Sequence, residues 1–184
     1  MNKKFKSVED TKITISELML PSHANFSGKI HGGHILSLMD QIAFACASKH
    51  SGQYCVTASV NKVDFLNAIE VGELVTMKAS INFTGRTSMV VGLRVESENI
   101  QTGIIKHCNS SYFTMVARDE NGKGVQVPGI ILKTEQQIRR FSRSIIRQQE
   151  LKTRSSRFSS DAFKMSQYVH LLRDSNSIVE LEDN

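Results

Sequence analysis

Residues 25–40 read Asn-Phe-Ser-Gly-Lys-Ile-His-Gly-Gly-His-Ile-Leu-Ser-Leu-Met-Asp, and this stretch decides the fold. Its first part is rich in loop-forming residues, and Gly32-Gly33 then introduces a segment with apolar residues at steps of three and four. The apolar residues of that segment are Ile35, Leu36, Met39, Ile42, Ala43, Cys46 and Ala47. The pattern predicts an apolar helix that runs to about Lys49, with Gly52 as its stop signal.

The segments on either side of this helix have the composition of strands. Before it, an apolar stretch at residues 13–20 ends at Pro21. After it, strand-like segments rich in Val, Ile, Thr, Phe and Met are found at residues 56–65, 74–83, 88–96 and 104–116. Short connections imply an antiparallel sheet, and Asn121-Gly122 is a tight-turn signal. An apolar helix buried against such a sheet gives an α+β fold class.

The composition is that of an ordinary globular chain. Of 184 residues, 40% are hydrophobic and 22% are charged. No run approaches the roughly 18–20 apolar residues that span a bilayer, and residues 1–10 lack the apolar core of a secretory signal. We therefore expect a cytoplasmic protein with reduced cysteines. Because the three cysteines (Cys46, Cys55 and Cys108) have no metal-like spacing, we expect no metal and no disulfide.

The chain divides by composition into a core at residues 1–132 and a tail at residues 133–184. Residues 133–157 hold eight Lys or Arg against two Glu, with apolar residues spaced for one helical face. The end of the tail is Ser-rich and then acidic, and we expect a basic, helical tail of unknown role. A net charge of +5 favours an anionic partner, which a nucleotide-bearing ligand, a membrane surface or a nucleic acid would satisfy equally.

The Gly32-Gly33 pair places bare backbone at the start of the predicted helix, where N–H groups lack intrahelical partners. Together with the helix dipole, those donors suit an oxygen that becomes negative during a reaction. A carbonyl docked there is polarised, and its tetrahedral oxyanion is stabilised. The alternative is a simple Gly-Gly turn into a helix.

Asp40 lies within the same apolar helix, between Met39 and Ile42. A carboxylate in such a segment is costly to bury unless it is paired or functional. It can act as a general base for water or as a nucleophile on a carbonyl carbon. The alternative places Asp40 on a solvent-facing side of the helix, near Ser37 and Gln41.

Three further groups can take part in the chemistry. The Asn25 amide can orient water or bind a carbonyl oxygen, although a loop asparagine more often forms an Asx turn. His31 and His34 bracket the glycine pair, but without a Gly-x-Ser-x-Gly elbow, local packing is the simpler role. Arg86, Thr87 and Ser88 join two strands and can hold phosphate or pantetheine groups, or else form an exposed hairpin turn.

In combination these pieces resemble one family, the hotdog-fold acyl-CoA hydrolases. The similar group is that of bacterial short- and medium-chain acyl-CoA thioesterases and brain-type acyl-CoA hydrolase. Residues 25–36 with Met39-Asp40 resemble the family's opening motif. Later pieces agree in order: Val63-Asp64-Phe65 with residues 71–74, residues 85–89, residues 96–99 with Thr102-Gly103, and residues 113–119 with Val127-Pro128. The resemblance covers about residues 10–130, and the tail has no match in it.

The resemblance implies a long central helix wrapped by an antiparallel sheet and a homodimer in which two sheets join, arranged as a hexamer of three dimers. It implies hydrolysis of fatty-acyl-CoA to fatty acid and coenzyme A, at sites where Asn25 of one subunit faces Asp40 of the other. The Gly33 N–H would polarise the thioester carbonyl, and Asp40 would be base or nucleophile. We expect no cofactor, since coenzyme A is part of substrate and product. The expected substrate-binding residues are Gly32, His34, Ala58, Ser59, Arg86, Thr87 and Ser88.

Two other readings of the chain stay open at this point. One is a non-catalytic acyl-CoA sensor whose basic tail binds nucleic acid. The presence of both Asp40 and Asn25 favours the enzyme. The sequence shows no helix-turn-helix and no aromatic stacking motif beside the arginines, which disfavours a nucleic-acid partner. The other uses the tail as a membrane-surface helix beside lipid substrates, or simply as a solvated helix that stabilises an oligomer.

Overall fold

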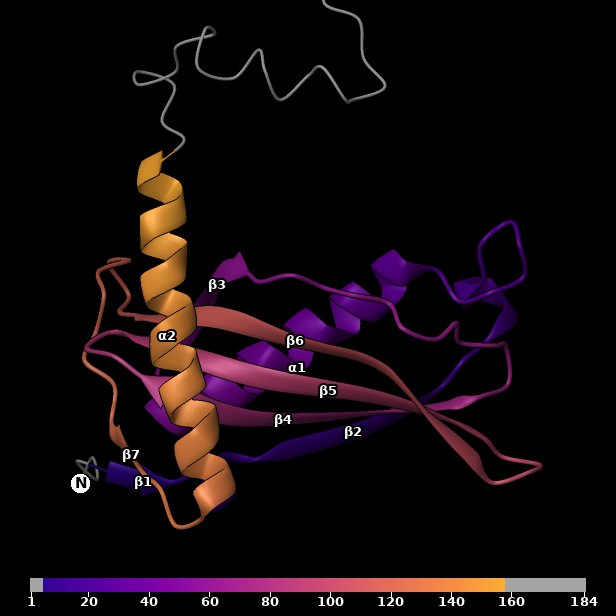
Figure 1. The fold of residues 1–184 in the computed structure, drawn as a ribbon, viewed down its shortest axis with the longest axis horizontal. Helices are drawn as coiled ribbons and strands as arrows, with labels where there is room; N and C mark the ends of the chain where they lie inside the picture. The colour runs from indigo at the N-terminus through magenta and orange to yellow at the C-terminus, as the bar shows by residue number, and fades with distance from the viewer. Residues whose placement is uncertain (1–4, 158–184) are drawn as a thin grey trace, which may run out of the picture. The chain divides into compact units, whose positions relative to one another are not determined.

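The computed structural model describes residues 5–157, in which a long helix lies along one face of a five-stranded sheet (Figure 1). The helix is α1 (Gly32–Ser51). The strands are β2 (Ile13–Leu18), β3 (Tyr54–Val60), β4 (Leu74–Thr84), β5 (Ser88–Asn99) and β6 (Ile104–Arg118). Their order across the sheet is β2-β4-β5-β6-β3, with every neighbouring pair antiparallel. The predicted α+β class, with one long helix against an antiparallel sheet, is confirmed.

Helix α1 begins and ends where the sequence signals predict. His31 caps its first turn, and Gly52 ends it in the left-handed conformation, with φ of 70°. The Gly52 N–H donates to the Ser48 carbonyl at 2.8 Å, so a carbonyl of the last turn is satisfied. The apolar side of α1 is buried over its whole length, from Ile35 to Ala47.

The sheet supplies the other half of the core through alternation along its central strands. On β4, Val75, Met77, Ala79 and Ile81 are buried, and on β5 the buried residues are Met89, Val91, Leu93 and Val95. These residues form one cluster with the apolar side of α1. Full burial of each large side chain contributes about 1.5–3 kcal/mol relative to exposure, so helix and sheet hold each other in register.

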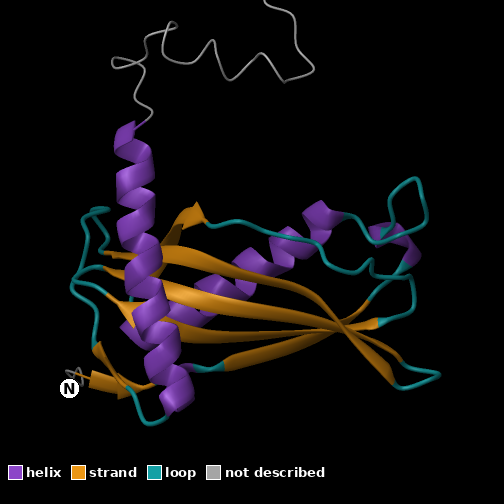
Figure 2. Ribbon diagram, in the orientation of Figure 1, coloured by secondary structure: helices purple, strands orange, loops and turns teal. Residues whose placement is uncertain are grey.

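Strand β3 is shorter than predicted, and the prediction of strand at residues 61–65 is wrong. Polar side chains of β6 take the backbone carbonyls that a continued strand would use. The Ser111 hydroxyl donates to the Asn61 carbonyl at 3.4 Å, and the Asn109 amide donates to the Asp64 carbonyl at 2.9 Å. Regular pairing therefore ends at Val60, and the chain runs to β4 as a loop that stays anchored to β6, where the Asn61 and Leu66 N–H groups donate to backbone carbonyls (Figure 2).

A second, two-stranded sheet was not predicted. Strand β1 (Phe5–Ser7) pairs in parallel with β7 (Gly129–Ile131). Three residues in each strand carry too little pattern to be recognised in the sequence. The pair ties the N-terminal segment to the chain that follows β6.

Helix α2 (Glu135–Arg157) lies in the predicted basic tail. The chain forms two compact units, Met1–Ile145 and Ile146–Asn184, so the boundary between them falls inside α2. Within the first unit the Phe83 and Phe141 rings lie 5.1 Å apart, and the Gln137 amide donates to Glu9 at 2.9 Å. The boundary proposed at residues 132 and 133 stays a prediction, and the Ser-rich and acidic end lies outside the described residues. Among residues 5–157, no helix combines the length and the apolar character that a membrane span needs.

Candidate active site

Asp40 is exposed on α1 and receives a hydrogen bond from the neighbouring strand. The Thr57 hydroxyl of β3 donates to Asp40 Oδ1 at 2.5 Å. Among the described residues, Oδ2 of Asp40 has no hydrogen-bond donor. Charge-assisted hydrogen bonds of this kind are short and about twice as strong as neutral ones. The bond fixes the carboxylate and leaves one oxygen available to a reacting molecule.

A β-bulge in β3 changes the direction of this edge strand next to Thr57. Thr57 pairs with Met115 and Ser59 pairs with Thr114, so Ala58 is an additional residue in the ladder. Such a bulge bends the strand and re-aims its side chains. Thr57, Ala58 and Ser59 are all exposed, and within residues 5–157 the outer edge of β3 has no strand beside it.

The N-terminus of α1 is partly occupied by groups of the chain itself. The Gly33 N–H donates to Nδ1 of His31 at 3.0 Å. The Gly32 N–H has no acceptor in the part of the chain that the structure describes. A Cβ added at Gly32 would lie 3.1 Å from the Phe65 ring, so a larger residue there would require the exposed Phe65 side chain to move slightly. A carbonyl oxygen that uses the Gly33 N–H must therefore displace the imidazole of His31.

Asn25 forms an Asx turn, and that turn orients its amide. Its Oδ1 accepts from the Ser27 N–H at 2.9 Å, the Ser27 hydroxyl at 2.7 Å and the Lys29 N–H at 3.2 Å. Because three donors converge on Oδ1, the other end of the side chain must be the NH₂ group. No acceptor for this Nδ2 is present among residues 5–157. Asn25 can thus form the Asx turn through Oδ1 and still bind a ligand through Nδ2.

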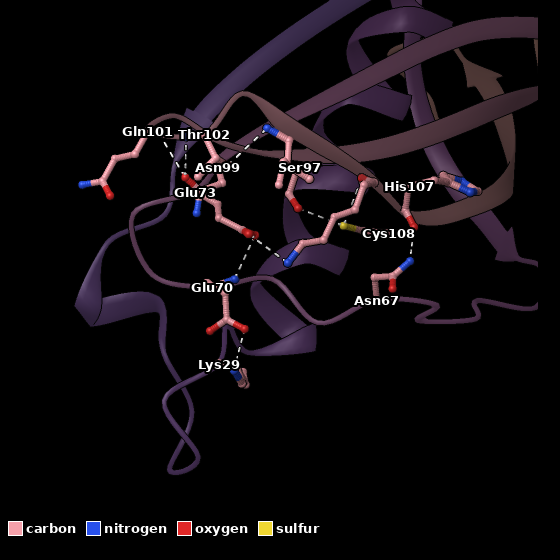
Figure 3. Close-up of polar contacts among 12 residues, drawn as sticks. Lys29, Asn67, Glu70, Glu73, Ser97, Asn99, Gln101, Thr102, His107 and Cys108 are labelled. Carbon is pink, nitrogen blue, oxygen red and sulfur yellow. Dashed lines mark hydrogen bonds and ion pairs between the residues drawn. The ribbon is translucent and has the colours of Figure 1, made fainter.

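A network of ion pairs anchors the loop that carries Asn25 (Figure 3). Glu73, which is nearly buried, accepts from Lys106 Nζ at 2.8 Å and from the Glu70 N–H at 3.0 Å. Glu70 in turn pairs with Lys29 at 2.5 Å, four residues after Asn25. Burial raises the pKa of Glu73, but hydrogen bonds from Lys106, the Glu70 backbone and Ser97 outweigh it, so the pKa is lowered overall. The loop before α1 is therefore tied to β4 and β6.

His34 belongs to a different cluster from Asp40. Its Nε2 lies 3.2 Å from Glu17 Oε1 on β2, and its ring stacks on that of His23 at 3.9 Å. The role of His34 in substrate binding stays a prediction, since these contacts direct it to β2 and not to β3.

The Arg86–Ser88 turn lies at the other end of the sheet from the start of α1. It follows the last residues of β4, whereas the loop before α1 pairs with Glu70, just ahead of the first residues of β4. The Gly85 N–H donates to the Ser88 carbonyl at 2.7 Å, as in a tight hairpin turn, and Arg86 is exposed. Within one chain, the turn therefore lies far along the sheet from the Gly32-Gly33 backbone.

A basic groove of about 400 Å³ is lined by the outward-facing side chains of β4 and β5 and by the start of α2. Its cationic residues are Lys12, Lys78, Arg94, Arg139 and Arg140. Lys78 and Arg94 pair with Glu96 at 2.6 and 2.7 Å, while Lys12 pairs with Glu9 at 2.7 Å. Neither Asp40 nor Thr57 lines this groove, so these five cationic side chains do not belong to the surroundings of the Asp40 carboxylate.

Within one chain, the structure brings Asp40 to Thr57, whereas among the described residues Asn25 and the Arg86–Ser88 turn make no hydrogen bond to Asp40. Thr57 was missed in the sequence analysis, because a threonine in a strand is ordinary and its distance of 17 residues from Asp40 gives no signal. Ala58 and Ser59, which were predicted to bind substrate, directly follow Thr57 on β3.

Several large apolar side chains on β3, on α1 and in the adjoining loops are exposed, namely Phe26, Phe44, Val60, Phe65 and Leu66. Phe44 lies one helical turn after Asp40, and Phe65 covers Gly32. Exposed apolar side chains that form one contiguous surface mark a binding site or a protein interface.

Comparison with known proteins identifies the family. Residues 27–104 match the model of the thioesterase superfamily. Protein VdlD of Helicobacter pylori is 44% identical over 148 residues, which are 80% of this chain and 84% of that protein. The chain belongs to the thioesterase superfamily. A Bacillus subtilis relative, named "Uncharacterized acyl-CoA thioester hydrolase YkhA", is 32% identical over 146 residues, 79% of this chain and 85% of its own.

Solved structures of the superfamily agree with this fold. A hexameric acyl-CoA thioesterase in its apo form has a TM-score of 0.80 and 37% identity, over 82% of this chain and 97% of its own. The acyl-CoA hydrolase of Staphylococcus aureus, in complex with butyryl coenzyme A, coenzyme A and coenzyme A disulfide, has a TM-score of 0.77 and 27% identity, over 91% of this chain and 98% of its own. The predicted hotdog fold is confirmed.

Proposed function

We propose that this protein hydrolyses fatty-acyl-CoA to a free fatty acid and coenzyme A. The observation that carries the proposal is the 2.5 Å bond from Thr57 to Asp40 on an exposed edge, because it leaves one carboxylate oxygen ready to act. The Bacillus subtilis and Staphylococcus aureus relatives are both named as acyl-CoA hydrolases, which supports the substrate class. The S. aureus complex with butyryl coenzyme A supports it further.

The thioester carbonyl docks against the first turn of α1, where the Gly32 and Gly33 N–H groups and the helix dipole stabilise negative charge on its oxygen. His31 leaves Gly33 as the carbonyl enters. The Nδ2 group of Asn25 donates to the carbonyl or to the attacking water.

Asp40 supplies the attacking group in one of two ways. As a base, it takes a proton from water while the water oxygen bonds to the carbonyl carbon. As a nucleophile, its oxygen bonds to that carbon, and water then cleaves the resulting anhydride. In both routes the C–S bond breaks and the electron pair leaves on sulfur. A thiol with a pKa near 8.5 leaves with little acid assistance, which fits a site without a strong acid.

A second copy of the chain completes the site in this proposal. The unpaired edge of β3 can join the same edge of a partner by two-fold symmetry, which would cover Phe44, Val60 and Phe65. Asn25 of one subunit would then face Asp40 of the other, and Arg86, Thr87 and Ser88 would reach the coenzyme A end of a substrate bound across the interface. We propose that three such dimers form a hexamer, the assembly named for one solved relative.

The test is hydrolysis of a panel of acyl-CoAs from acetyl to palmitoyl, followed by thiol release. Cys46, Cys55 and Cys108 are buried, so the protein's own thiols add little signal. The variants are Asp40→Asn and, as matched control, Glu120→Gln, which removes an exposed carboxylate elsewhere. We expect kcat to fall about 10²-fold or more in Asp40→Asn and to stay unchanged in Glu120→Gln.

The same panel separates the enzyme from the sensor alternative. Coenzyme A binding without turnover on any substrate would reject hydrolysis and favour a non-catalytic acyl-CoA sensor. The roles of the tail on nucleic acid or membranes stay predictions. Salt-dependent binding to DNA or to anionic vesicles, with and without residues 133–184, would test them.

A further inference from the structure

Glu17, His23 and His34 meet at a place that the proposed reaction does not use. They come from β2, from the short helix η2 (Pro21–His23) and from the first turn of α1. One potential ligand atom from each lies within 4.8 Å of the other two. All three side chains are partly buried, with exposed fractions of 36%, 19% and 26%. No other set of three metal-binding side chains is this close among residues 5–157.

The distances are close to those of a coordination shell. With bonds of about 2.0–2.1 Å, neighbouring ligand atoms of a tetrahedral zinc site lie about 3.3–3.4 Å apart. The Nε2 of His34 lies 3.2 Å from Glu17 Oε1, and the Nδ1 of His23 lies 3.9 Å from the same oxygen. The ligand atoms of His23 and His34 lie within 4.8 Å of each other, so His23 must move toward the other two ligands to complete the arrangement.

Few other contacts oppose such a shift. His23 Nδ1 accepts only a long 3.3 Å bond from the Leu20 N–H. The imidazoles of His23 and His34 are stacked with their centroids 3.9 Å apart, so one ring must also turn for both nitrogens to point at a common ion beside the carboxylate. Two imidazoles and one carboxylate are the donor set that Zn²⁺ and related divalent transition metals prefer.

We propose that Glu17, His23 and His34 form a binding site for a divalent transition metal of the Zn²⁺ class, with water at the remaining position. The site joins β2, η2 and α1, and it therefore clamps the loop before the helix that carries Asp40. The bound metal would hold this loop in position relative to α1 and would take no part in thioester cleavage. Binding is linked to protons, because both imidazoles must be neutral to coordinate.

The experiment uses the full chain freed of metal by a chelator. Zn²⁺ is titrated calorimetrically, and Co²⁺ is titrated with visible absorption as the readout of coordination. We expect one metal per chain, a rise in Tm on binding, and loss of binding at pH 5. Glu17→Gln and His34→Ala should each weaken Zn²⁺ binding by about tenfold or more, whereas His107→Ala, which removes an imidazole outside the cluster, should not.

A second measurement guards against variants that fail to fold. X-ray absorption at the zinc edge of the wild-type complex should show only nitrogen and oxygen ligands near 2.0–2.1 Å, including imidazole. Sulfur ligands would place the metal on cysteine and overturn the proposal. So would the absence of stoichiometric binding, or equal affinity in the wild type and in folded Glu17→Gln and His34→Ala.

Discussion

The Thr57 hydroxyl donates to Asp40 Oδ1 at 2.5 Å and so joins the edge strand β3 to helix α1. Helix packing alone would place Asp40 on an exposed face, beside Ser37 and Gln41. The bond from Thr57 gives the carboxylate a defined orientation there. The bulge at Ala58 lies one residue beyond this threonine.

Removal of this hydroxyl is expected to reduce turnover. A hydrogen bond to a charged group contributes about 1.5–3 kcal/mol, so Thr57→Val should lower kcat by about tenfold to a hundredfold. KM should change little, because the bond orients Asp40 and does not hold the substrate. Thr57→Ser keeps a hydroxyl and should retain most of the activity. Steady-state kinetics of the three proteins test this, and equal kcat values in Thr57→Val and wild type would exclude the positioning role.

In the proposed reaction, His31 and the substrate carbonyl compete for the Gly33 N–H at the start of α1. His31→Ala removes the cap from the Gly33 N–H, which should destabilise the fold by about 1 kcal/mol. The Gly33 N–H then becomes available to the carbonyl, so kcat/KM should stay equal or rise. Thermal unfolding and kinetics of the same preparation test both effects. A large fall in kcat with unchanged Tm would instead make His31 a catalytic residue.

The ion-pair network of Glu73 predicts acid sensitivity. Its pKa is lowered in the fold, so ionised Glu73 contributes stability that is complete at neutral pH and is lost as pH falls below the usual carboxyl range. Glu73→Gln should lower the free energy of unfolding at pH 7 and flatten its decline between about pH 5 and pH 3. Denaturant unfolding at several pH values measures this, and parallel curves for variant and wild type would refute it.

His50 predicts a second pH effect in a higher range. Its burial lowers its pKa, and nearby Lys6 adds to that, although the bond to the Pro128 carbonyl acts in the opposite direction. As pH falls, His50 is therefore protonated at a higher pH in the unfolded chain than in the folded protein. The free energy of unfolding should consequently fall as pH drops below about 6.5. His50→Gln should show a smaller change in Tm between pH 7.5 and pH 5.5, measured in chelator so that other histidines bind no metal. An identical change in the variant would contradict the assignment.

The helix and the central strands could be predicted because each satisfies a local rule. The apolar spacing from Ile35 to Ala47, with Gly52 after it, is complete within one segment. The failure at residues 61–65 has a different origin. There the carbonyls of Asn61 and Asp64 bond to side chains of β6 that lie about 45–50 residues away, and no local pattern encodes such a choice.

The candidate site shows the same division. Asp40 and Asn25 could be named because each lies in a short motif of a known family. Thr57 could not, because its role depends on the packing of β3 against α1. The Glu17, His23 and His34 cluster also depends on the fold, since cysteine spacing in the sequence predicted no metal.

The central claim is that each active site takes Asn25 from one subunit and Asp40 from the other, and complementation tests it most directly. Asn25→Ala and Asp40→Asn chains, each inactive alone, are mixed, exchanged through unfolding and refolded. Random pairing gives half heterodimers, each with one intact site of two, so activity should recover to about a quarter of the wild type. Activity that stays at the level of the separate variants, in a preparation shown to contain heterodimers, would place both residues in one chain's site and contradict the account.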